Sequence, residues 1–67
     1  MDKSIREYIK ENFKGRTTND IKQSIESSIN EKDEVLLPGL GVLLETVWSN
    51  SNEELKSQLL DILTKNL

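Results

Sequence analysis

The chain has 67 residues, a formal net charge of −3 and a hydrophobic content of 34%. That length allows one domain with one modest core and excludes a second domain. With neither cysteine nor histidine, it lacks disulfides and the thiolate and imidazole groups that most nucleophilic, acid–base and zinc chemistry uses, so we predict no enzyme activity, no metal site and no cofactor.

Membrane contact is not expected either. The longest stretch rich in apolar residues spans residues 35–48, and proline, glycine and polar residues interrupt it. A spanning helix needs about 20 apolar residues in succession. The start of the chain also lacks a basic-then-apolar leader. We therefore expect an intracellular protein that makes no contact with a membrane.

A first helix is predicted at about residues 3–14. Apolar side chains recur there at three- and four-residue steps, at Ile5, Tyr8, Ile9 and Phe13. Asp2 and Ser4 could both cap its N-terminus, because short oxygen-bearing side chains accept from the free amides of a first turn. Gly15 is a suitable stop.

The second predicted helix covers residues 18–31. Ile21, Ile25 and Ile29 repeat at four-residue steps. Three candidate caps precede them, namely Thr17, Thr18 and Asn19. The stripe is narrow and the other faces are polar, so we expect this helix at the edge of the core. The acidic run at residues 30–34 loses the apolar period and is predicted to be a solvated loop.

The third predicted helix, at about residues 38–49, starts near Pro38, with residues 35–37 as an extended lead-in. Its main face is Leu40, Leu43, Leu44, Val47 and Trp48. We expect it to be the central helix, with Trp48 in the core. Gly39 and Gly41 are interpreted mechanically, as sites of close helix approach or of positive φ.

A fourth helix is predicted at residues 52–66, where Ser51 and Glu54 have the spacing of a capping box. Its stripe consists of Leu55, Leu59, Ile62 and Leu63. Four short helices without strand-like alternation predict an all-α fold, a compact four-helix domain spanning residues 1–67.

One side of the first predicted helix carries basic residues at three- and four-residue steps, namely Lys3, Arg6, Lys10 and Lys14. This basic face could bind an anion, DNA phosphates or an acidic partner. Salt links to the second predicted helix, or plain solvation, explain it at lower cost. General coating of DNA is disfavoured, because the chain carries 12 acidic against 9 basic residues.

Three apolar residues lie off the main stripes: Val42, Leu60 and Leu67. Two roles remain open for them, because an apolar side chain beside a stripe can either widen the core or make a contact between two copies in a dimer.

The segment from Leu37 to Trp48, Leu-Pro-Gly-Leu-Gly-Val-Leu-Leu-Glu-Thr-Val-Trp, resembles the Leu-Pro-Gly-Leu-Gly-Val-Leu-Phe-Glu-Val-Ile-Trp signature of the small acid-soluble spore protein I family. The signature residues Leu37, Pro38, Gly39, Leu40, Gly41 and Trp48 match. Leu44, Thr46 and Val47 depart from it. The matching residues are apolar or glycine, so the resemblance implies a structural role for them.

The resemblance also implies a protein made in the forespore and held in the spore core. We expect a non-catalytic structural or protein-interaction role in sporulation, with an unknown protein partner or self-association, a dimer included. The alternatives are a nucleic-acid-associated module that uses the basic face, or a small regulatory helical protein.

Overall fold

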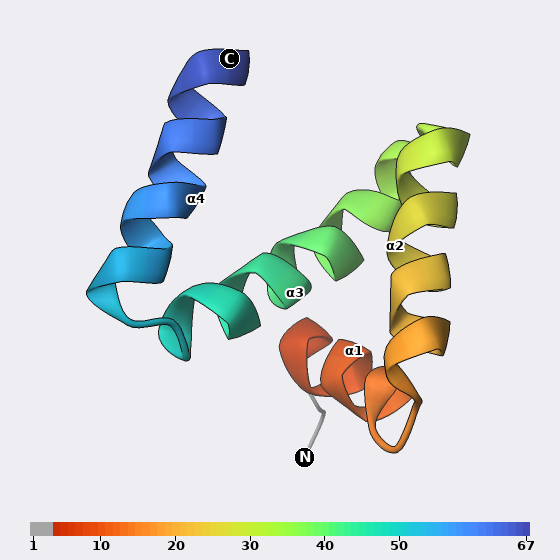
Figure 1. Cartoon of the computed structure of the whole chain (residues 1–67). Coiled ribbons are helices and arrows are strands. Elements are labelled where there is room, and N and C mark those ends of the chain that lie inside the picture. The colour runs from red at the N-terminus through yellow and green to blue at the C-terminus, as the bar shows by residue number, and fades with distance from the viewer. Residues whose placement is uncertain (1–3) are drawn as a thin grey trace.

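The computed structural model of the chain describes residues 4–67. Within this range the order is α1 (Ile5–Phe13), α2 (Thr18–Glu31), the short 3₁₀ helix η1 (Glu34–Leu36), α3 (Leu37–Ser49) and α4 (Glu53–Asn66), without a strand (Figure 1). The prediction of an all-α chain with four helices is confirmed. The ends of the helices lie within two residues of the predicted ones.

Hydroxyl side chains begin the first two helices. The Oγ of Ser4 accepts a hydrogen bond from the backbone N–H of Glu7 at 3.2 Å. The Oγ1 of Thr17 accepts from the N–H of Asp20 at 3.1 Å. Each bond satisfies one of the amides that a helix leaves free at its start. Asp2, the other candidate cap, lies outside the described residues.

The extended lead-in predicted before Pro38 is wrong, because η1 occupies it and continues directly into α3. The Asp33 carboxylate accepts from the N–H of Val35 at 3.0 Å and starts this turn. Leu37 is helical although a proline follows it. Pro38 then sits in the first turn of α3, where its missing N–H would have had no partner in the helix.

The capping box predicted for α4 is also wrong. The cap is Asn52, whose Oδ1 accepts from the N–H of Leu55 at 2.8 Å. The Ser51 hydroxyl instead donates back to the Val47 carbonyl, and the Asn50 amide donates to another carbonyl of α3 at 2.8 Å. The side chains of residues 50 and 51 thus pair with free carbonyl groups at the C-terminal end of α3. The next residue, Asn52, is left to cap α4.

Neither mechanical explanation of Gly39 and Gly41 holds within the chain. Gly15 is the glycine with positive φ, at 75°, just after the end of α1. A Cβ placed on Gly39 or on Gly41 would meet no atom within 4 Å. Among residues 4–67, no neighbouring helix therefore requires a glycine at either position.

Helix α3 is central, since it packs against both α1 and α2. Val42 on α3 is the one buried hydrophobic residue of the described chain, with 6% of its surface exposed. The half-buried large apolar side chains of the first three helices and η1 are Ile9, Phe13, Ile21, Ile25, Leu36, Leu40 and Leu43, whereas α4 has Leu59 alone. The core therefore belongs to the first three helices.

Helix α4 stands apart from this core. It leaves the far end of α3 at an angle, and its C-terminal end points away from the other helices (Figure 1). Among residues 4–67, α4 makes no contact as extensive as those of α3 with α1 and α2. The radius of gyration is 13.3 Å, against about 11 Å for a compact domain of this length. The four-helix unit is therefore more open than the compact domain that we predicted.

Candidate functional site

One basic residue of the basic face of α1 is paired with an acidic residue of α3. The Arg6 guanidinium donates two hydrogen bonds to the Glu45 carboxylate, from Nε to Oε2 at 2.6 Å and from Nη2 to Oε1 at 2.9 Å. The expected salt link thus runs to α3 rather than to α2. This two-pronged pairing fixes the orientation of both side chains and ties α1 to the middle of α3.

The pair changes the titration of both residues. Hydrogen bonding to Arg6 lowers the pKa of the Glu45 carboxyl below its usual value, and the charge of nearby Lys10 acts in the same direction. The hydrogen bond to Glu45 correspondingly raises the pKa of Arg6. Both side chains are more than half exposed, so solvent screens the attraction and the pair contributes more to geometry than to stability.

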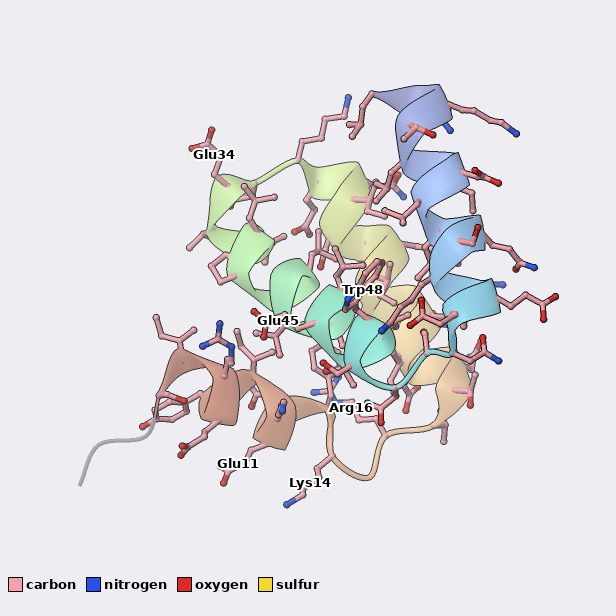
Figure 2. All side chains as sticks on the ribbon, turned by 90° about the vertical axis from the view of Figure 1, so that its left-hand side faces the viewer. Glu11, Lys14, Arg16, Glu34, Glu45 and Trp48 are labelled. Carbon is pink, nitrogen blue, oxygen red and sulfur yellow. The ribbon has the colours of Figure 1, made fainter. Side chains whose placement is uncertain are left out.

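The other basic residues do not form a continuous cationic surface with Arg6. Lys14 projects away from the other helices (Figure 2), Lys10 lies near enough to Glu45 to affect its pKa, and Lys3 falls outside the described residues. One of the three described cations is therefore neutralised by Glu45. Sequence reasoning missed Glu45, although a single acidic residue within an apolar helix was a signal that it needs a basic partner.

The signature segment forms the length of α3, and its residues divide between the core and the surface. Gly39 and Leu40 are half-buried, whereas Leu37 and Gly41 are exposed. Pro38 lies in the first turn of the helix. Helix α3 contacts both α1 and α2, and its covered residues, Gly39, Leu40, Val42 and Leu43, lie in its N-terminal half. This half of the signature builds the core.

Trp48 lies outside the core, contrary to the prediction, where α3 approaches α4 (Figure 2). Its side chain remains 38% exposed. The ammonium of Lys56 on α4 lies 5.3 Å from the centroid of the Trp48 ring and 3.8 Å from the Glu53 carboxylate. A cation over an indole ring is attracted by the electron-rich face of the ring. This contact joins α3 to α4.

Apolar side chains on both sides of this junction are left uncovered. We call them the α3–α4 surface: Leu44, Val47 and Trp48 of α3 with Leu55, Leu60 and Leu63 of α4, which are 38–52% exposed. On α4 the apolar residues from Ile62 round to Leu60 span an arc of about 160°, wider than the stripe of an ordinary surface helix. Lys56 and Leu59, the half-buried residues of α4, lie within that arc, so the arc faces α3.

The three residues off the predicted stripes have different environments. Val42 is buried on α3, the helix that packs against α1 and α2, and belongs to the core. Leu60 is 47% exposed within the α3–α4 surface, and Leu67 at the end of the chain is 98% exposed. Of the three, Leu60 and Leu67 are accessible to a partner, whereas Val42 is not.

Neither a candidate metal cluster nor a helix able to span a membrane lies within residues 4–67. No three acidic, histidine or cysteine side chains in this part of the chain gather closely enough to hold a metal ion. None of the helices described there combines the length and the apolar character that crossing a membrane requires.

Comparison with known proteins places this sequence in a family. The family model described as "Small, acid-soluble spore protein I" matches residues 4–67. A protein of that name from Geobacillus kaustophilus is 40% identical over 63 residues, which cover 94% of this chain and 91% of the relative. One from Halalkalibacterium halodurans is 36% identical over 67 residues, covering 100% and 98%. No solved structure matches. The chain therefore belongs to the small, acid-soluble spore protein I family and is a spore protein.

Proposed function

We propose that this chain is a non-catalytic protein of the spore core that acts in sporulation by binding protein through its α3–α4 surface. The observation that carries the proposal is the exposure of six large apolar side chains on two adjoining helices. Contiguous apolar patches on soluble proteins mark sites of association, because leaving them in water is unfavourable.

The surface favours a helical ligand. Apolar side chains on two adjoining helices give an amphipathic helix an apolar face to pack against. Trp48 at the junction is the type of residue that dominates binding energy in such interfaces. Lys56 and Glu53 already form an ion pair beside Trp48, so these two charged groups need no partner from a ligand.

The charges oppose a nucleic-acid role. A DNA-binding face gains affinity by releasing counterions from several phosphates. Here Glu45 occupies Arg6 and the whole chain carries a net charge of −3. Contact through Lys10 and Lys14 is an outcome that the experiment below detects, since such binding weakens steeply as salt rises.

The proposal is tested by gentle purification from spores of strains that carry single variants. Native chain should elute with protein, above the size of a monomer, and elution should not depend on salt. Leu60→Glu should shift it to the monomer position. Gln58→Glu is the matched control, because it adds the same charge at an exposed polar position of α4 and should elute like the native chain.

Two results would contradict the proposal. Native chain that elutes as a free monomer would show that the α3–α4 surface has no ligand in the spore. Co-elution with DNA that disappears at higher salt, and that Lys10→Glu or Lys14→Glu abolishes, would assign the function to the basic face instead.

A further inference from the structure

We infer that the occupant of the α3–α4 surface is the same surface of a second copy, in a symmetric dimer whose two α4 helices lie antiparallel. This inference rests on the proposed function and names its partner. It follows from three observations: the area left exposed, the isolation of α4, and the match of the surface to itself.

The exposed area is too large for a finished monomer. The accessible surface is 5909 Å², whereas a compact monomer of this mass exposes about 4,300 Å². The excess is therefore about 1,600 Å² per chain. Part of this excess lies away from α4, since Ile5, Val35 and Leu37 are 59–75% exposed. Two chains that each buried about half of the excess would form an interface of about 1,600 Å², the standard size of a specific interface.

The isolation of α4 points to a partner for the same reason. Helix α4 has 14 residues, and an isolated helix of about 12–15 residues is marginal in water. Its cap at Asn52 and its ion pair between Lys56 and Glu53 are each weak supports. Without extensive contacts to α1, α2 or α3, this helix needs an apolar face from elsewhere to stay folded.

A second copy fits the surface better than an unrelated helix. The α3–α4 surface of each copy lacks an apolar neighbour, and the same surface of the other copy supplies one. A twofold contact therefore covers both surfaces at once. Antiparallel packing sets the N-terminal end of one α4 beside the C-terminal end of the other, where the opposite partial charges of the two helix ends attract each other. Small chains without disulfides commonly gain their missing core by oligomerisation, and this chain has no cysteine.

The charged residue Lys56, which lies beside this interface, does not oppose formation of the dimer. Lys56 lies within the apolar arc, but its side chain is only 26% exposed and its ammonium is already placed between Glu53 and the Trp48 ring. Its methylene stem adds apolar surface. The contact with a second copy therefore buries no new unpaired charge.

The mass of the purified full-length chain is the first test. Sedimentation equilibrium should give twice the 7.7 kDa chain mass. Dilution should lower the average mass and the helical circular dichroism signal together, because α4 unfolds when it loses its contact with the second copy. A monomer mass at every concentration up to about 1 mM would overturn the inference.

Substitutions on α4 test the location of the contact. Leu60→Glu should raise the dissociation constant of the dimer by more than about 30-fold, whereas Gln58→Glu should change it by less than about threefold. If both variants dissociate equally, or neither does, the dimer uses another surface and the inference is wrong.

Cross-linking tests the antiparallel orientation without destabilising a helix by charge. Leu60 lies at the middle of α4, so the two Leu60 positions approach each other across the twofold axis. Leu60→Cys should form a disulfide between copies on mild oxidation, because a bridge requires Cα atoms about 4.4–6.8 Å apart. Gln58→Cys on the polar face should not. A reversed pattern would contradict the orientation.

Failure of the dimer can be told apart from failure of the proposed function. If the pure chain is a monomer but the spore form still co-elutes with another protein in a way that Leu60→Glu abolishes, the second copy is wrong and protein binding stands. If the pure chain and the spore form are both monomeric, both proposals are wrong.

Discussion

Replacing Gly41 with alanine should stabilise the protein. Gly41 is the fifth residue of α3, its φ is not positive, and an added Cβ would meet nothing within 4 Å. A glycine inside a helix costs about 0.5–1 kcal/mol relative to alanine, because it loses more backbone entropy on folding. Gly41→Ala should therefore raise the free energy of unfolding by about that amount and the melting temperature by roughly 4 °C.

The assay is urea unfolding followed by far-ultraviolet circular dichroism at one fixed protein concentration, since association makes stability depend on concentration. Gly15→Ala is the matched contrast. Gly15 has a φ of 75°, a conformation that costs an L-residue about 1–2 kcal/mol, so this variant should be destabilised. If Gly41→Ala also destabilised the protein, another chain would have to pack against this part of α3, and the open space at Gly41 would not exist in solution.

Three further outcomes follow from the contacts of α1, α3 and α4. Because Arg6 lowers the pKa of Glu45, the stability that this carboxylate contributes is complete above the unfolded-state pKa, about 4.3, and is lost as the pH falls through the lower folded-state pKa. Thermal melts of Glu45→Gln against pH should therefore approach those of the native chain in acid, and a constant difference would contradict the pair. Lys56→Ala should remove about 0.5–1 kcal/mol and move the fluorescence emission of Trp48 to longer wavelength, whereas unchanged emission would mean that the cation does not cover the ring. Asn52→Ala should cost about 1 kcal/mol in urea unfolding, and no loss would show that α4 is capped in another way.

Much of the local structure could be predicted from the sequence. Apolar residues at helical spacing identify all four helices, because each helix must present one apolar face to something. Ser4 and Thr17 cap the helices that follow them as expected. The errors fall between helices, where Asn52 displaced Ser51 as the cap of α4. Several polar residues in a row compete there, and the neighbouring helix end decides which of them is free to cap.

The arrangement of the helices could not be predicted in the same way. Arg6 and Glu45 are 39 positions apart, and no local pattern selects one carboxylate among the acidic residues of the chain as the partner of Arg6. The stripe of α4 predicts an apolar neighbour but does not say whether that neighbour belongs to the same chain. A compact four-helix domain would cover this stripe, whereas most of it is exposed.

The character of α3 explains why this chain leaves apolar surface open. A helix that is apolar around most of its circumference is normally covered on every side. The chain packs α1 and α2 against α3 and buries Val42 there, but it leaves Leu44 and Val47 about half exposed. Because α1 and α2 are occupied and α4 diverges (Figure 1), no helix of the described chain is left to cover these two side chains. The segment that carries the family resemblance is therefore only partly covered by the helices of residues 4–67, which is the observation behind the dimer that we propose.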